Sequence, residues 1–158
     1  MKTLKRTIKF LERKEVEKII TAIKPEGSRN LRDRALIEVL FSTGLRISEA
    51  LALEWDIMNG ADGKKTHEIT IIGKGGWQRV VYFSPQAQRA VVYYNAVATG
   101  YLAKKESKLI FPITGLCAQK MVIDRARTAG ITKGVTPLVF RHSLATDLLR
   151  RGVDIAFV

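Results

Sequence analysis

The stretch HEITIIGKGGWQRVVYF, residues 67–83, decides the fold class, because the spacing of apolar residues changes there. Two runs rich in β-branched and aromatic residues, 67–73 and 77–83, are separated by Lys74 and two glycines. Such runs around a short glycine turn are typical of a β-hairpin. The segments on either side have apolar residues at helical spacing. The sequence therefore predicts a mainly α fold with a small antiparallel β-sheet, an α+β class.

Helices are predicted on both sides of the hairpin from apolar spacing and from capping residues. Asn30 is a candidate N-cap, while Ser84 and Thr136 each precede a proline that suits the first position of a helix. The predicted helices cover residues 11–23, a segment from Asn30 to Gly44, 46–53, a segment that opens at Pro85, 114–129 and 136–151.

The length and composition of the chain indicate one globular domain, with 158 residues of which 46% are hydrophobic and 27% charged. No apolar run approaches the roughly 18 residues that a membrane span needs, and the first ten residues lack the apolar core of a secretion signal. One cysteine, Cys117, and two histidines, His67 and His142, offer too few ligands for a usual metal site. The sequence therefore predicts a cytoplasmic protein without metal or cofactor.

The charge of the chain points to a polyanionic partner, because the formal net charge is +12. The basic excess lies at the two ends, with 11 basic and 5 acidic residues in 1–34 and 11 and 4 in 85–158. A globular domain of this charge most often binds nucleic acid, where neutralised phosphates release counterions. A basic protein without such a partner is the alternative.

Arg141 lies between two apolar sets on the helix that opens at Pro137, so it is predicted to face inward. A charge in that position needs a partner, since an unpaired buried charge is costly. The partner is either an internal carboxylate or a bound anion, for which the planar guanidinium suits phosphate oxygens. The two apolar sets are Phe140, Leu144 and Leu148 on one side and Leu138, Ala145 and Leu149 on the other.

Arg46 and Glu49 are one helical turn apart at the start of a helix, so their side chains can meet. Either the two form a surface ion pair of little consequence, or the carboxylate orients the arginine toward a ligand. Lys74, at the tip of the hairpin beside two glycines, is by itself a typical solvated turn lysine.

Three segments together resemble the catalytic domain of tyrosine recombinases, the phage integrase family. They are TGLRISEALAL (43–53), IIGKGGWQRVVYF (71–83) and TPLVFRHSLATDLLRRGVDIAFV (136–158), in the family's order and spacing. The resemblance covers nearly the whole chain. It implies a mainly helical domain with a small sheet, which agrees with the predicted elements.

The resemblance also implies roles for five residues in DNA recombination and integration by phosphodiester transesterification. Arg46 and Arg141 correspond to the arginines that hold the scissile phosphate, and Lys74 to the general acid toward the leaving 5′ oxygen. Glu49 and His142 correspond to supporting residues. The implied partner is double-stranded DNA, with further recombinase protomers as candidates, and neither a metal nor a cofactor is implied.

Two features depart from the family pattern. Leu138 occupies the position of the histidine in the family's His-x-x-Arg motif, and none of the four tyrosines, Tyr82, Tyr93, Tyr94 and Tyr101, matches the family's nucleophile. Residues 1–24 already resemble the first helix of the catalytic domain, so we expect a single, C-terminally incomplete catalytic domain without the N-terminal core-binding domain. Three interpretations stay open: a DNA-binding fragment of a recombinase, a non-catalytic DNA-binding relative that acts as regulator or decoy, and an interaction module with no role on DNA.

Overall fold

The computed structural model describes residues 9–58, 67–102 and 107–154, and the predictions made for Tyr101 and for residues 155–158 fall outside its described side chains. The predicted class, mainly α with a small antiparallel sheet, is confirmed. The elements are α1 (Arg13–Ala22), α2 (Gly27–Thr43), α3 (Ile47–Leu51), η1 (Trp55–Met58), β1 (Glu68–Ile72), η2 (Lys74–Gly76), β2 (Gln78–Tyr82), α4 (Pro85–Leu102), α5 (Gly115–Thr128) and α6 (Pro137–Arg150).

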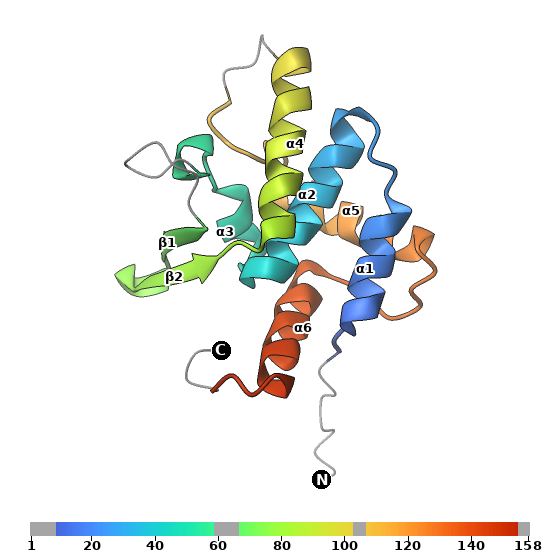
Figure 1. Ribbon diagram of the computed structural model, residues 1–158, viewed down its shortest axis with the longest axis vertical. Coiled ribbons are helices and arrows are strands. Elements are labelled where there is room, and N and C mark those ends of the chain that lie inside the picture. The colour runs from blue at the N-terminus through green and yellow to red at the C-terminus, as the bar shows by residue number, and fades with distance from the viewer. Residues whose placement is uncertain (1–8, 59–66, 103–106, 155–158) are drawn as a thin grey trace.

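Helix α2 is the centre of the domain (Figure 1). It packs against α1, α3, α4, α5, α6 and strand β2. A helix in such a place is apolar on more than one face, and the buried residues of α2 are Leu31, Asp33, Ala35, Leu36, Ile37, Val39, Leu40 and Phe41. The end of α2 at Thr43 is therefore held firmly, and the turn that follows it has a fixed position.

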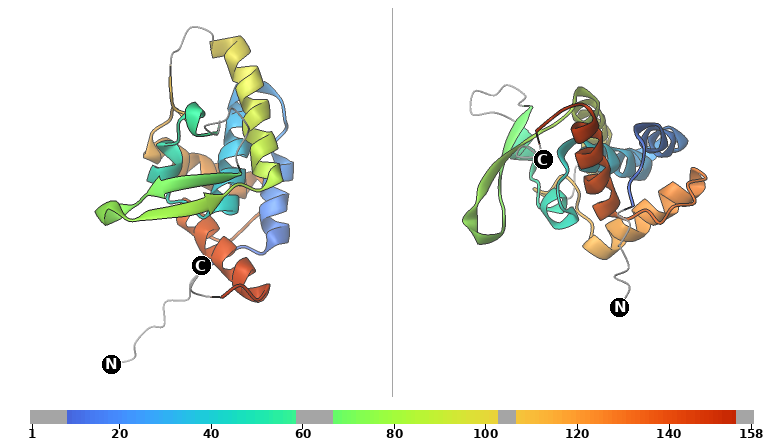
Figure 2. Two further views of the ribbon diagram at one scale, coloured as in Figure 1. Left: turned by 60° about the vertical axis from the view of Figure 1, so that its left-hand side comes forward. Right: turned by 90° about the horizontal axis from the view of Figure 1, so that it is seen from below.

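The hairpin extends away from the helices, as Figure 2 shows. Strands β1 and β2 pair antiparallel, with Ile69 opposite Val81 and Ile71 opposite Arg79. Ile69, Ile71 and Val81 are buried against the helices. The alternation of side chains along a strand places Arg79 on this same inner face.

The starts of helices α4 and α5 follow from local capping. The Ser84 hydroxyl accepts a hydrogen bond from the backbone N–H of Ala87 at 3.1 Å, as the predicted cap of α4 requires. On α5, the hydroxyl of Thr114 accepts from the N–H of Cys117 at 3.2 Å. The predicted cap at Asn30 is wrong, because α2 already begins at Gly27.

Asn30 instead belongs to an ion-pair network between α2 and α5. Its side-chain oxygen accepts a hydrogen bond from Arg125 at 2.7 Å. Arg125 also donates to one carboxylate oxygen of Asp33, at 3.0 and 2.7 Å, and Arg32 donates to the other oxygen at the same two distances. The Asp33 side chain is 2% exposed. This network therefore joins the two helices through a buried charge whose hydrogen bonds are satisfied.

Among the described residues, no helix has the length and apolar character needed to cross a membrane.

Candidate functional site

The turn between α2 and α3 positions the first candidate arginine. Gly44 ends α2 with φ of 66°, in the left-handed region that favours glycine. A Cβ at this position would also lie 3.0 Å from a methyl group of Leu144 on α6, which would have to shift to make room for it. Leu45 is buried directly after the turn, and Arg46, the N-cap of α3, is exposed. The buried leucine thus fixes the backbone from which Arg46 projects.

The predicted contact between Arg46 and Glu49 is present. One carboxylate oxygen of Glu49 accepts the backbone N–H of Arg46 at 2.9 Å, and the other lies 3.8 Å from the Arg46 guanidinium. The first oxygen also accepts a hydrogen bond from Arg79 of β2 at 2.6 Å. Glu49 therefore holds two arginines that come from different elements, α3 and the hairpin.

The pKa of Glu49 reflects this environment. Burial raises the pKa of the carboxyl. The hydrogen bonds from Arg79 and from the Arg46 backbone, together with the charges of both arginines, lower the pKa by more than burial raises it, so the net shift is downward. The carboxylate form of Glu49 is thus stabilised by the fold.

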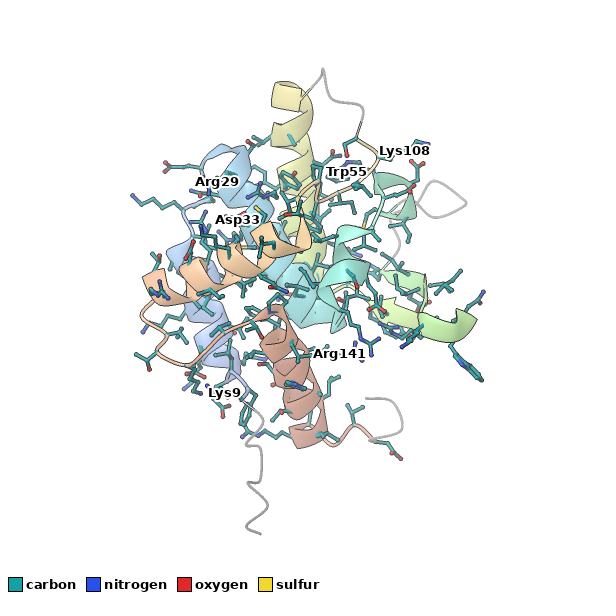
Figure 3. All side chains as sticks on the ribbon, turned by 180° about the vertical axis from the view of Figure 1, so that it is seen from behind. Lys9, Arg29, Asp33, Trp55, Lys108 and Arg141 are labelled. Atoms are coloured by element: carbon teal, nitrogen blue, oxygen red, sulfur yellow. The ribbon has the colours of Figure 1, made fainter. Side chains whose placement is uncertain are left out.

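Arg141 reaches the same turn from α6. Its guanidinium donates a hydrogen bond to the backbone carbonyl of Gly44 at 3.0 Å, and Figure 3 shows Arg141 near the end of α6 that lies toward α3 and the hairpin. Burial and the charges of Arg46 and Arg79 lower the pKa of Arg141, while Glu49 opposes them. Within the described part of the chain, Arg141 forms no ion pair with a carboxylate.

The predicted apolar surroundings of Arg141 are half correct. Phe140 is buried and Leu144 is partly buried against the core, but Leu138 is 57% exposed and Leu149 is exposed as well. Helix α6 buries one face only, with Pro137, Val139, Phe140 and Ser143. Arg141 therefore lies at the edge of the core and is partly buried.

We refer to Arg46, Arg79, Arg141 and Glu49 as the arginine cluster. Three guanidinium groups lie within electrostatic range of one another, with one carboxylate among them. Repulsion between partly buried like charges is relieved when an anion binds. The cluster is suited to an oxyanion such as a phosphate, which guanidinium groups bind through paired hydrogen bonds.

The structure leaves two of the candidate residues outside the arginine cluster. Lys74 is exposed at the tip of the hairpin, in η2, and His142 is partly exposed on α6. Within the residues that the structure describes, neither side chain forms a hydrogen bond or an ion pair with the cluster.

Arg79 is the member of the arginine cluster that sequence reasoning missed. It lies in the run WQRVVYF, where every second residue, Arg79, Val81 and Phe83, faces inward. A charged residue on the same face of a strand as buried apolar residues needs a hydrogen-bond partner within the protein. This pattern could have identified Arg79 from the sequence.

The structure is a mainly helical domain with an arginine cluster beside its hairpin, and comparison with known proteins assigns it to a family. Residues 9–158 match the model of the phage integrase family. The chain is 38% identical over 135 residues to the tyrosine recombinase XerD of Corynebacterium glutamicum, covering 82% of this chain and 43% of that protein. It is 32% identical to XerD of Halalkalibacterium halodurans, covering 99% and 54%. The chain therefore belongs to the phage integrase family and spans about half the length of these relatives.

Solved structures agree with this assignment. The crystal structure of XerA recombinase superposes with a TM-score of 0.78 at 26% identity, covering 94% of this chain and 53% of that one. XerH site-specific recombinase, in a pre-cleavage complex with its difH substrate, has the same fold, with a TM-score of 0.74 at 24% identity and coverage of 98% and 47%.

The lowered pKa of Glu49 leads to a prediction about acid stability. A carboxyl whose pKa is lower in the folded than in the unfolded chain stabilises the fold above the unfolded pKa, and this contribution disappears as the pH falls through the folded pKa. We expect the wild-type chain to be more stable than Glu49→Gln at pH 7, and the difference to shrink below the usual carboxyl range of about 4.5. Urea unfolding of both proteins between pH 7 and pH 3 measures this, and a difference independent of pH contradicts it.

Proposed function

We propose that this chain binds duplex DNA around a backbone phosphate and forms the phosphate-binding part of a site that breaks and rejoins DNA. The observation that supports the proposal most directly is the arginine cluster, in which Arg46 and Arg79 contact Glu49 while Arg141, close enough to feel all three charges, has no carboxylate partner among the described residues. The net charge of +12 favours the same partner. The relatives named as recombinases support DNA recombination as the process.

In this proposal, Arg46 and Arg141 hold the non-bridging oxygens of the scissile phosphate. Glu49 orients Arg46 through the contact with its backbone N–H, and the hydrogen bond to Gly44 orients Arg141. Lys74 protonates the leaving 5′ oxygen, and His142 supports the site beside Arg141.

The chemistry of the proposed reaction explains why guanidinium and ammonium groups suit these positions. Transesterification of a phosphodiester increases negative charge on the non-bridging oxygens in the transition state, and fixed cations there lower the barrier. A general acid is needed as the 5′ oxygen leaves, and Lys74 lies on an exposed loop that DNA can approach. The nucleophile in the family is a tyrosine, and no tyrosine of this chain matches its motif.

The second candidate function is that of a non-catalytic DNA-binding relative, a regulator or decoy. Leu138 favours it, because an exposed leucine can neither donate a hydrogen bond to a phosphate nor exchange a proton. Both candidates include DNA as the partner. We further propose the cytoplasm as the location and other recombinase protomers as additional partners.

A titration of labelled duplex DNA tests the proposal. We expect a dissociation constant of roughly 1–100 μM at physiological salt, and an affinity that falls at least about tenfold between 50 and 200 mM salt, because bound phosphates release counterions. Fluorescence anisotropy measures both. The absence of binding at 50 mM salt contradicts the proposal and favours an interaction module without a role on DNA.

A further inference from the structure

Arg79 is a charged residue on the buried face of the hairpin. It pairs with Ile71 across the sheet and lies in line with the buried Val81. Its side chain is 35% exposed. A guanidinium among apolar neighbours requires hydrogen-bond partners, because its desolvation is otherwise uncompensated.

The side chain of Arg79 joins two parts of the molecule. One terminal nitrogen donates to Glu49 of α3 at 2.6 Å. The other lies against the loop of the hairpin, since a Cβ on Gly73 would be 3.1 Å from it. Gly73 directly precedes Lys74. Arg79 therefore extends from the loop that presents Lys74 to the carboxylate that contacts Arg46.

The strands of the hairpin are anchored by buried Ile69, Ile71 and Val81, but the tip of the loop beyond them is exposed. It is closed by hydrogen bonds within the hairpin, from the Gly73 N–H to the carbonyl of Trp77 at 2.8 Å and from the Gly76 N–H to the carbonyl of Gly73 at 3.2 Å. Lys74 and Trp77 are exposed. The described contacts that connect this end of the hairpin to α3 run through Arg79 and Glu49.

We infer that Arg79 is a positioning residue, which holds the Lys74 loop in a fixed relation to Arg46 through Glu49. The inference rests on the proposed function, since it assigns Lys74 and Arg46 to one DNA phosphate. In this inference Arg79 does not itself bind the phosphate: one of its terminal nitrogens is engaged by Glu49, and the other lies close to the backbone of Gly73. Its charge is balanced by Glu49, whereas Arg141 has no carboxylate partner among the described residues.

A double-mutant cycle separates positioning from direct binding. Arg79→Gln, Glu49→Gln and the double variant are compared for affinity to a short duplex, with Arg127→Gln, an exposed arginine of α5, as the control for lost charge. We expect Arg79→Gln to weaken binding about fivefold, in the range for coupled ion pairs. When Glu49 is already replaced by glutamine, we expect Arg79→Gln to lower the affinity for DNA no more than Arg127→Gln does. We also expect the slope of log affinity against log salt in Arg79→Gln to stay near that of the wild type.

A direct phosphate contact gives the opposite results. The effects of Arg79→Gln and Glu49→Gln are then additive, and the slope of log affinity against log salt falls by about 0.9, the value for one phosphate contact. This outcome overturns the inference and leaves the proposed function intact.

A measurement without DNA keeps the two proposals separable. We expect the NMR resonances of the Arg46 Nε–H and the Gly73 N–H to shift in folded Arg79→Gln and to stay in place in Arg127→Gln. Gly73→Ala provides a second variant with Arg79 retained, since φ of −87° at this position allows alanine while the methyl group, 3.1 Å from the guanidinium, requires that group to shift. The same shifts in Gly73→Ala support the inference. Unchanged Arg46 resonances in both variants overturn it, and a wild-type chain that does not bind DNA overturns the proposed function alone.

Discussion

Replacement of Asp33 by alanine is expected to lower the free energy of unfolding by about 3 kcal/mol, the low end of the range for breaking a buried ion pair. The carboxylate is 2% exposed and accepts hydrogen bonds from both Arg32 and Arg125. Its removal leaves two guanidinium groups facing each other without a counter-charge. Water can reach both arginines, whose side chains are partly exposed, and this keeps the loss from being larger.

Urea unfolding followed by circular dichroism measures this prediction. Asp124→Ala is the matched control, because Asp124 is an exposed aspartate of the helix that provides Arg125. We expect the control to change stability by no more than about 0.5 kcal/mol, as surface substitutions do. Equal effects of the two substitutions would mean that the Asp33 network contributes nothing beyond an ordinary surface pair.

The elements that sequence reasoning predicted correctly depend on interactions between near neighbours. The hairpin follows from alternation within two short runs and from the glycines between them. The start of α4 follows from a hydroxyl that accepts an N–H three residues later. In both cases the residues that decide the structure are adjacent in the chain, so the pattern contains the information.

The error at Asn30 shows where such reasoning stops. Asparagine is a good N-cap when no other partner competes. Here α2 begins at Gly27, so Asn30 lies inside the helix, and its side-chain oxygen accepts a hydrogen bond from Arg125, 95 residues further along the chain. A contact of that kind depends on how α5 packs against α2, and local spacing has no information about it.

The arginine cluster was predictable in part for the same reason. Arg46 and Glu49 are one turn apart, so their contact was visible in the sequence. The need of Arg141 for a partner was visible too, but the partner is the Gly44 carbonyl, 97 residues away, and not a carboxylate. The second arginine that contacts Glu49 is Arg79, which lies on a strand 30 residues further along the chain. Its prediction would have required knowing how the hairpin packs against α3.

Replacement of Arg141 separates the stability of the fold from anion binding. We expect Arg141→Leu to weaken DNA binding about 10- to 100-fold, which is the loss of a hydrogen bond to a charged group worth roughly 1.5–3 kcal/mol. The same substitution leaves the free energy of unfolding unchanged or raises it, because burial and the charges of Arg46 and Arg79 already disfavour the cation at this position.

The two measurements together test whether Arg141 acts on the ligand or on the fold. Anisotropy at fixed salt gives the affinity, urea unfolding gives the stability, and Arg127→Leu on the exposed face of α5 controls for the lost charge. Arg141→Lys retains the charge without the planar pair of donors, so its affinity should fall between those of the wild type and Arg141→Leu. If affinity and stability fell together in Arg141→Leu, the hydrogen bond to Gly44 would be the main role of this arginine. If Arg141→Leu loses affinity while its stability is unchanged, the main role of Arg141 is to bind the phosphate. The repulsion that Arg141 experiences from Arg46 and Arg79 is then balanced by the bound anion.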